Sequence, residues 1–549
     1  MLPPAPQALG TPHDWLPHEK PSIPGSPGTP LHSTRRRVAY AAVGTVLALT
    51  GGLGNALVSA NLQNLQGSLG VFTLQVAWLP TVFVMTSVCM NLLLVKFRQQ
   101  YGIRLFAEIG LLAYIAVAFG HLFVNDFRSA IAARAFAGIA AAPLSTLGLY
   151  YFIQAAPAVH RIKAIVLALG VGQLATPLAR LIPADLLGID AWNGLNMFEL
   201  GLAIICYACV LLLRLPPSDR IKVFEPLDFV TFALFAPGIA LLCAVLGVGR
   251  YEWWTAAPWL GWALAASVAL LTTALIIEHN RSQPLINTRW IAGGDIARIA
   301  LAIILVRIVL SEPTVGAVGM LQTLGLTNDQ FHGLYWIILA ATATGFVASA
   351  FLLDVNHIPR PILIALALIA VGSLLDARST SLTRPENLYL SQAMIAFAGA
   401  IFLGPALMAG FTRVIQKGYA YLASFSVLFS VTQSLGGLAG AAALGSLQVV
   451  REKYHSNQLA EGITQADPQT VLRLQQLGGA YAHTLGDATL RGGEAVALLG
   501  QQVTREANVL AFDDIFRVFA MIAAATFVWI AILYARAQMR ARAARQATA

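Results

Sequence analysis

Residues 229–248 read FVTFALFAPGIALLCAVLGV, a run without a charged side chain that is long enough to cross a membrane. The hydrocarbon core of a bilayer takes about 20 apolar residues as an α-helix. Similar runs recur from residue 38 to about residue 534, mostly with short gaps between them. No soluble domain needs this pattern along its whole length, so we predict an all-α polytopic membrane protein.

About fourteen membrane helices are predicted. The composition agrees, since 57% of the residues are hydrophobic and 11% are charged, whereas soluble domains carry about 25% charged residues. The net charge of +9 lies mainly in the loops, so no nucleic-acid partner is predicted. The helices are expected at residues 38–62, 73–95, 105–123, 129–153, 163–183, 196–214, 228–248, 256–277, 295–320, 331–353, 360–376, 389–412, 421–447 and 513–535.

The distribution of basic residues predicts the orientation. Arg35, Arg36 and Arg37 directly precede the first helix and place the N-terminus in the cytoplasm, because cytoplasmic loops attract Lys and Arg. A missed helix would invert this bias from that point onward, but it holds to the basic tail at 536–549. Both termini are therefore predicted to be cytoplasmic. The short loops on the outside hold few basic residues, namely Arg128, Arg250, Arg378 and Arg384.

Two segments outside the apolar runs have their own predictions. Residues 1–34 are rich in Pro, Gly and Ser and predict a disordered cytoplasmic tail without a cleavable signal peptide. Residues 448–512 form a long outside loop. Its apolar residues recur at helical spacing over 468–511, which predicts two or three amphipathic helices that pack over the outer mouth. A disordered connector is the alternative.

No pattern typical of a soluble enzyme is present. The sequence holds no phosphate-binding loop of the Walker type and no serine nucleophile elbow, so neither direct ATP drive nor an enzymatic activity is predicted. No metal and no cofactor are expected. The four cysteines lie within apolar runs without metal-site spacing; they are Cys89, Cys206, Cys209 and Cys243.

Several short patterns follow one another along the chain in a characteristic order. They are Trp78, RAFAG at 134–138, Thr176 with Pro177, Glu278 with PLIN at 284–287, LGGLAG at 435–440 and ANVLAFDDIF at 507–516. In this order, and with fourteen helices, the chain resembles the drug:proton antiporters of the major facilitator superfamily, the EmrB/QacA type. It departs from that type in four places: GGLGN at 51–55 lacks an aspartate, Gln99 stands near an expected aspartate, Arg180 and Leu181 replace glycines, and Gln433 replaces an arginine.

The resemblance implies a major facilitator fold with two six-helix bundles, at 35–214 and 291–535, joined by two extra helices within 215–290. It implies export of hydrophobic small molecules in exchange for protons across the cell inner membrane. It also implies a periplasmic adaptor protein and an outer-membrane channel as partners. Two alternatives remain open: a facilitator or importer without proton coupling, and a receptor or scaffold that does not transport.

Charges at membrane depth are candidates for function because burying them is costly. Arg134, Arg180 and Glu199 are expected in the outer half of the first bundle, where one carboxylate beside two guanidiniums would stabilise all three. Glu199 is the preferred coupling acid, and a static ion pair is the alternative. Arg307 and Glu312 are the candidates in the second half, where Pro313 should break the helix and free carbonyls. Several arginines with few acids favour an amphipathic anion as substrate.

Small residues and one proline are the candidates for conformational roles. In membrane helices such residues let backbones approach closely, and in a rocking transporter the same contacts form the sliding surface. The sequence does not separate the two roles. The candidates are Gly102, Gly138, Pro177, Gly436, Gly437 and Gly440.

Overall fold

The computed structural model describes residues 9, 15–16, 19–21, 25–182, 192–281, 284–354, 357–417, 421–464 and 466–548. Within these ranges the chain is helical apart from turns, loops and one isolated β-bridge between Pro27 and Ser218. Thirteen of the described helices are long and apolar enough to cross a membrane. The predicted all-α, multi-pass architecture is confirmed.

Every predicted span coincides with helix in the structure. The first half holds α1 (Thr34–Ala60), α2 (Leu62–Leu69), α3 (Thr73–Tyr101), α4 (Ile103–His121), α5 (Phe127–Ala155), α6 (Arg161–Gln173), α7 (Ala175–Leu181) and α8 (Trp192–Leu212). The next four are α9 (Pro226–Glu252), α10 (Pro258–Asn280), α11 (Thr288–Ile291) and α12 (Gly294–Val309). The rest are α13 (Val318–Thr323), α14 (His332–Leu352), α15 (Pro359–Asp376), α16 (Tyr389–Lys417), α17 (Leu422–Glu461), α18 (Pro468–Gly479) and α19 (Ala488–Thr548).

The span predicted at 295–320 is broken. It consists of α12, a π-helical segment η3 (Pro313–Ala317) and α13. Pro313 has no backbone N–H and its ring crowds the preceding turn, which disfavours a regular α-helix at this point. π-helical turns inside helices are frequent at functional sites. This break is why α12 alone is too short to count among the thirteen membrane-length helices.

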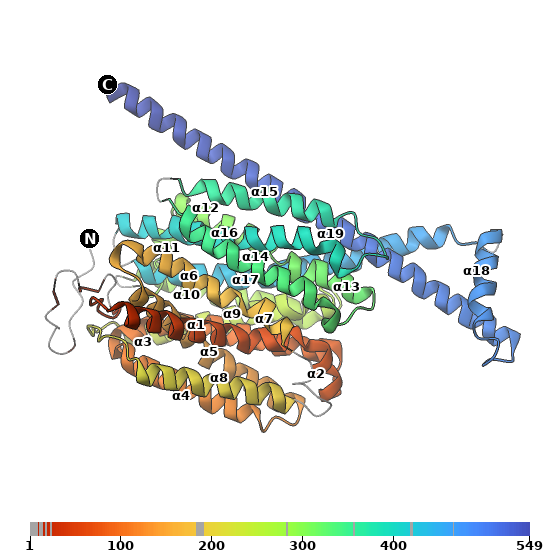
Figure 1. The fold of residues 1–549 in the computed structure, drawn as a ribbon, viewed down its shortest axis with the longest axis horizontal. Coiled ribbons are helices and arrows are strands. Elements are labelled where there is room, and N and C mark those ends of the chain that lie inside the picture. The colour runs from red at the N-terminus through yellow and green to blue at the C-terminus, as the bar shows by residue number, and fades with distance from the viewer. Residues whose placement is uncertain are drawn as a thin grey trace.

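The helices form one elongated bundle (Figure 1). In that view α4 and α8 line one long side, α15 lies along the opposite side, and α6 and α14 run between them. The chain enters α1 and leaves α19 toward the same end, which we call the terminal end. The opposite end, beyond which α18 lies, is the α18 end. Termini at one end are what an even number of crossings requires.

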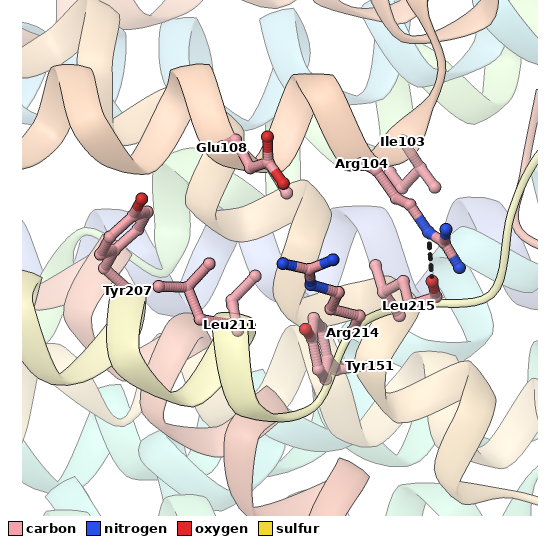
Figure 2. A pocket seen from close by; sticks show the side chains of 10 residues that line it. Ile103, Arg104, Glu108, Tyr151, Tyr207, Leu211, Arg214 and Leu215 are labelled. Atoms are coloured by element: carbon pink, nitrogen blue, oxygen red, sulfur yellow. Dashed lines mark hydrogen bonds between the residues drawn. The ribbon is translucent and has the colours of Figure 1, made fainter.

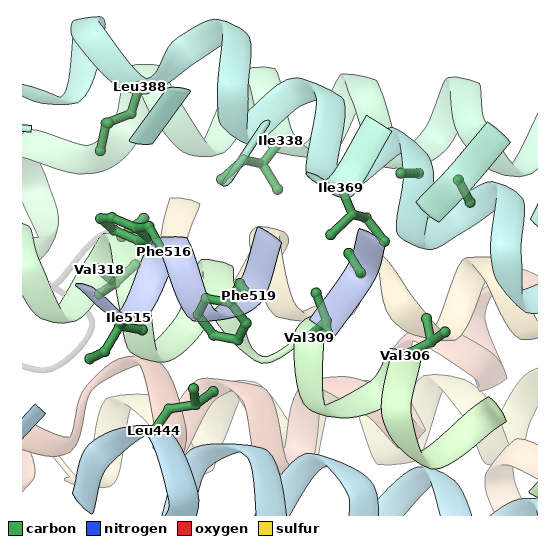
Figure 3. Packing of buried hydrophobic residues seen from close by; sticks show 14 of the residues in the cluster. Val306, Val309, Val318, Ile338, Ile369, Leu388, Leu444, Ile515, Phe516 and Phe519 are labelled. Carbon is green, nitrogen blue, oxygen red and sulfur yellow. The ribbon is translucent and has the colours of Figure 1, made fainter. Parts of the chain in front are cut away.

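Each half has its own apolar core. In the second half Val306, Ile338, Ile369 and Phe516 belong to one buried cluster that joins α12, α14, α15 and α19 (Figure 3). In lipid, apolar contact alone does not drive helices together, so association depends on close packing. Gly138 shows this in the first half. A Cβ there would collide with Thr86 and the Phe83 carbonyl, so only glycine lets α5 approach α3 this closely.

Residues 448–512 are mostly helical where described, but they do not pack over the mouth of the bundle as predicted. α17 continues to Glu461, α19 begins at Ala488, and α18 projects away from the bundle (Figure 1). α18 packs against α19 instead, where a Cβ on Gly478 would lie 3.3 Å from the Arg491 carbonyl oxygen. This pairing leaves apolar side chains uncovered, since Leu472 is 57% exposed and Val496 is 60% exposed.

The prediction of a disordered tail over 1–34 is wrong for residues 25–33. The Gly28 N–H donates to the Pro217 carbonyl (2.9 Å), and Gln154 Nε2 donates to the Gly28 carbonyl (2.8 Å). His32 also contacts Gln154. Prolines keep both this segment and the stretch near Pro217 extended, so their backbone groups are free to pair with each other. Apart from residues 9, 15–16 and 19–21, the rest of the predicted tail before residue 25 lies outside the described residues.

Candidate functional site

The first candidate site surrounds Arg134 in α5. This side chain is 2% exposed. It donates to the Gly54 carbonyl (2.8 Å) and to Asn55 Oδ1 (3.0 Å), both in α1, and its guanidinium lies 4.7 Å from the centre of the Phe83 ring. The guanidinium is thus held by neutral oxygens and an aromatic face. We refer to Gly54, Asn55, Tyr114, His121, Arg134 and Glu199 as the Arg134 cluster.

Local sequence explains why Arg134 lies at this depth. Asp126 caps α5 by accepting from the Ser129 N–H (3.0 Å), which fixes where the helix begins. Arg134 follows about two turns later. One turn further on, Gly138 brings α3 close enough for the Phe83 ring to cover the guanidinium. The arginine and the glycine of the RAFAG pattern therefore act together.

Glu199 of α8 approaches the same residue of α1, Gly54. It is 5% exposed and accepts a hydrogen bond from the Tyr114 hydroxyl (2.9 Å). His121 Nδ1 lies 3.6 Å from Glu199 Oε2. A Cβ on Gly54 would stand 3.0 Å from both Glu199 Oε1 and the Tyr114 hydroxyl. The glycine thus leaves room for the carboxylate beside a backbone whose carbonyl already binds Arg134.

The two charges of this cluster make no direct ion pair in the described structure. Both approach Gly54 of α1: its carbonyl accepts from Arg134, and a Cβ there would stand 3.0 Å from Glu199 Oε1. Because a buried charge without a partner is costly, protonating Glu199 would change how well the charge on Arg134 is compensated. Tyr114 and His121 were not predicted from the sequence. They lie seven residues apart in α4, which places them on one face of the helix.

Arg180 does not join Arg134 and Glu199, so the predicted grouping of three charges is wrong. Its guanidinium donates to the Ala60 carbonyl (3.2 Å) and to Asn328 Oδ1 (3.2 Å), and it lies 5.7 Å from the centre of the Tyr335 ring. Asn328 in turn donates to the Arg180 carbonyl (3.3 Å). Arg180 occupies the last turn of α7. From there it reaches the second half of the molecule at the α18 end.

Pro177 and Gly102 both occupy helix beginnings. Pro177 lies in the first turn of α7, where a missing N–H costs little, just after the break that separates α6 from α7 at Leu174. Gly102 has a φ of 87° and stands between α3 and α4. Its positive φ suits glycine, and the following Ile103 N–H is capped by the Ser218 hydroxyl (3.1 Å).

Arg307 of α12 is packed against the glycine run of α17. Its Nε donates to the Gln433 carbonyl (3.2 Å). A Cβ on Gly436 would lie 2.9 Å from Arg307 Cβ, whereas one on Gly437 would lie 3.5 Å from Arg307 Nε. A Cβ on Gly440 would lie 3.0 Å from the backbone of Ile308. The glycines therefore provide the space in which α12 and its arginine fit.

Glu312, directly before the break in α12, belongs to a second buried site. Gln392 Nε2 of α16 lies 3.0 and 3.1 Å from the two Glu312 oxygens and 2.7 Å from Asp376 Oδ2 of α15. All three side chains are at most 1% exposed. We refer to them as the Glu312 cluster. Asp376 and Gln392 were missed, because both fall at the ends of predicted helices, where polar residues are ordinary.

A charged network at the terminal end connects α9 and α10 to α3. Lys96 of α3 binds Asp228 (2.6 Å). Arg281 binds Glu225 (2.8 Å), Asp228 (2.9 Å) and Glu278 (2.6 Å). Burial lowers the pKa of Arg281, but its hydrogen bonds to the three carboxylates outweigh burial and raise it above the ordinary value. Arg281 therefore keeps its positive charge, and the network holds α3, α9 and α10 together at this end.

A small hollow lies between the beginning of α4 and the end of α8 (Figure 2). Arg104, Glu108 and Arg214 line it together with Tyr207, and Arg104 Nε donates to the Leu215 carbonyl (3.1 Å). It lies away from both polar clusters. Within the described ranges no group of three or more His, Cys, Asp or Glu side chains could hold a metal ion.

Comparison with known proteins gives one family match. The family described as Major Facilitator Superfamily matches residues 44–441. Among solved structures the chain is similar to the E. coli proton:xylose symporter XylE bound to 6-bromo-6-deoxy-D-glucose, with 14% identity, a TM-score of 0.52, and coverage of 89% of this chain and 95% of that one. It is also similar to the human organic anion transporter MFSD10 (TETRAN), with 14% identity, a TM-score of 0.51 and coverage of 90% and 100%. Both likenesses concern the fold alone. No curated protein sequence matches the chain.

Proposed function

The chain belongs to the major facilitator superfamily, and on that premise we propose that it is a secondary active exporter. It moves hydrophobic or amphipathic small molecules, anionic ones included, out of the cell in exchange for protons. Its domains would be two six-helix bundles, at 35–214 and 291–535, with a pair of linker helices within 215–290. The fourteen-helix drug:proton antiporters are the proposed subfamily.

The observation that carries the proposal is that Arg134 and Glu199 both approach Gly54 of α1. A proton that binds Glu199 removes the negative charge nearest to α1, while Arg134 stays bonded to the carbonyl of the same residue. The free energy of packing α1 against α5 and α8 then depends on whether a proton is bound. A protonation-dependent packing energy is what a proton-driven conformational cycle requires.

The arginines support the choice of substrate. Arg134 and Arg307 lie in different halves, and neither makes an ion pair within the described part of the chain. Guanidinium groups with only neutral partners are suited to bind a carboxylate that enters between the halves. Arg180 and Glu312 complete the proposed set of substrate and coupling residues, together with Glu199.

The projecting helices support the proposed partners. Leu472, Leu490 and Val496 are 57%, 60% and 60% exposed on α18 and the first turns of α19. Apolar side chains that project beyond a membrane bundle form a surface that a protein partner can cover. We propose that this surface lies in the periplasm of a cell with an inner membrane, and that it binds an adaptor leading to an outer-membrane channel.

The second candidate function is a facilitator or importer without proton coupling. The absence of an acidic residue in GGLGN at 51–55 favours it, because the antiporters it resembles carry an aspartate there. In that case Glu199 would serve only to fix α8 against α1 through Tyr114. A receptor or scaffold without transport is the third possibility, and its binding surface would be the projecting helices.

Export can be tested in everted membrane vesicles. Two probes cover the proposed substrates: ethidium as a hydrophobic cation and a fluorescent long-chain fatty acid as an amphipathic anion. The proposal predicts uptake of at least one probe into the vesicles that depends on an inwardly acidic pH gradient. Uptake that is equally fast without a gradient, and that stops at equal concentrations, would favour the facilitator. No movement of either probe would favour the receptor.

A further inference from the structure

Two buried carboxylates in the second half share a single neutral partner. Glu312 and Asp376 come from different helices, and both lie within 3.1 Å of one nitrogen of Gln392. Among the described residues no Lys, Arg or His makes an ion pair with either. Two negative charges held this close in apolar surroundings repel each other strongly, and an amide cannot neutralise them.

Among the described residues, the surroundings offer no compensating charge. The Ser391 hydroxyl of α16 interacts with Asp376 and donates to the Leu388 carbonyl (3.0 Å), but it is neutral. Tyr335 of α14 lies near Glu312 and also near Arg180, whose guanidinium is 5.7 Å from the centre of the ring. On α19, Asp513 is a third acid, and Arg517 lies one turn beyond it with its guanidinium on Asp514 (3.2 Å). Phe516, which belongs to the apolar cluster of Figure 3, lies against Gly316 beside Glu312.

Two buried oxygen atoms of this cluster lack a hydrogen-bond partner. They are Asp376 Oδ1 and Gln392 Oε1. Buried polar atoms in folded proteins are normally paired, so two orphaned acceptors in one cluster indicate a missing donor. A carboxyl group that carries a proton is such a donor. Turning the Gln392 amide by half a rotation would instead point its oxygen at both carboxylates, which increases the need for a proton.

We propose that Glu312, Gln392 and Asp376 form a proton-binding site in which the two carboxyl groups share one proton. The proton binds a carboxyl oxygen and reduces the charge of the pair from two to one. A sodium ion fits less well, because the amide N–H groups already occupy the space between the carboxylates and would repel a cation. Carboxylates that share one proton because they cannot both ionise are a known arrangement in enzymes.

The position of the site gives the proton a structural consequence. Glu312 directly precedes the π-helical segment Pro313–Ala317, and a Cβ on Gly316 would lie 3.3 Å from Glu312 Oε1. The state of the carboxyl therefore acts on the broken part of this span. In transport this site would be a second proton site beside Glu199, and that role rests on the proposed proton exchange. The existence of the site does not depend on that proposal.

Infrared spectroscopy of the purified full-length protein in detergent tests the proposal without substrate or gradient. The wild type should show the carbonyl stretch of about one buried protonated carboxyl at neutral pH, and its loss at higher pH. The Glu312→Gln/Asp376→Asn double variant should lack this band, while Glu199→Gln keeps it. These spectra do not depend on the outcome of the export test. The proton-binding site and the proposed export can therefore be refuted independently.

Three results would overturn the assignment: no such band in the wild type, a band that survives the double substitution, or a band that appears only when choline replaces sodium in the buffer. If the double variant does not fold, the single isosteric Asp376→Asn variant should shift the pH at which the band titrates. Thermal unfolding gives a second readout. Wild-type stability should fall as pH rises through the titration of the pair, because the folded state binds the extra proton.

Discussion

The Arg134 cluster and the Glu312 cluster stabilise their buried ionisable side chains in different ways. In the Arg134 cluster a cation and an anion both approach one glycine; Arg134 is held by neutral oxygens and an aromatic ring, and Glu199 by Tyr114 and His121. In the Glu312 cluster two acids share one amide and have no described cationic partner. The first arrangement can exist with both groups charged, whereas the second needs a proton. Polar residues in apolar helices thus form two clusters whose contributions to folding stability should depend on pH in opposite directions.

Arg134→Ala should have the largest effect, because it converts the first cluster into one that holds an acid without a cation. It removes charge-assisted hydrogen bonds that are worth about 1.5–3 kcal/mol. We expect transport of the active probe to fall at least about tenfold, since 1.4 kcal/mol is a factor of ten. Reconstituted vesicles with equal protein content give the measurement. Arg134→Lys should also fail, because a point charge cannot contact Gly54 and Asn55 together. Normal transport by a correctly inserted Ala variant would remove Arg134 from the mechanism.

Replacing the acid of each cluster by its neutral amide should change the unfolding temperature differently in the two clusters. Glu199→Gln keeps a partner for Tyr114 but leaves Arg134 with less compensation, so we expect a lower unfolding temperature at neutral pH. Glu312→Gln replaces one member of a crowded acidic pair by a neutral isostere, so we expect an unchanged or higher temperature. Thermal unfolding of both variants in the same detergent decides this. Equal shifts in the same direction would mean that the clusters do not differ as described.

Glycine substitutions should test how closely α1 approaches Glu199 and how closely α17 packs against α12. A Cβ on Gly54 would stand 3.0 Å from Glu199 Oε1, and one on Gly440 would stand 3.0 Å from the Ile308 backbone. We expect Gly54→Ala and Gly440→Ala to reduce transport several-fold. Gly437→Ala is the matched control on α17, because its Cβ would meet Arg307 only at an ordinary 3.5 Å. Initial rates of probe uptake measure the difference. An impaired control with a normal Gly440→Ala would contradict the packing argument.

Arg180 should have the smallest effect of the predicted charges, since it belongs to neither cluster. Its bonds to Ala60 and Asn328 join the halves at the α18 end. We expect Arg180→Ala to weaken this contact and to raise the reactivity of a cysteine introduced at Ala60 toward a membrane-impermeant thiol reagent, because Ala60 binds Arg180 through its backbone carbonyl and a cysteine there keeps the contact. The same cysteine in the wild-type background is the control. A reactivity that does not change would show that Arg180 does not hold the halves together.

The fold was predictable because hydropathy reports directly on membrane spans, and every predicted span has a helix. The depth of Arg134 and Glu199 followed from their places in those helices. The sequence did not reveal which residues meet across helices. Arg180 was assigned to the wrong neighbours because the break at Leu174 and the reach of a long side chain are properties of packing. Asp376 was missed because the end of a helix is where an acid is least conspicuous.

The central claim is that protons drive transport through the Arg134 cluster, and reconstitution in proteoliposomes tests it most directly. The substrate probe identified in vesicles is supplied together with a pH gradient of defined sign, and internal pH is followed at the same time. We predict that the probe accumulates against its own gradient while protons move the opposite way. Glu199→Gln should still equilibrate the probe but should not accumulate it. Accumulation by Glu199→Gln equal to the wild type, or wild-type transport without any proton movement, would contradict the account.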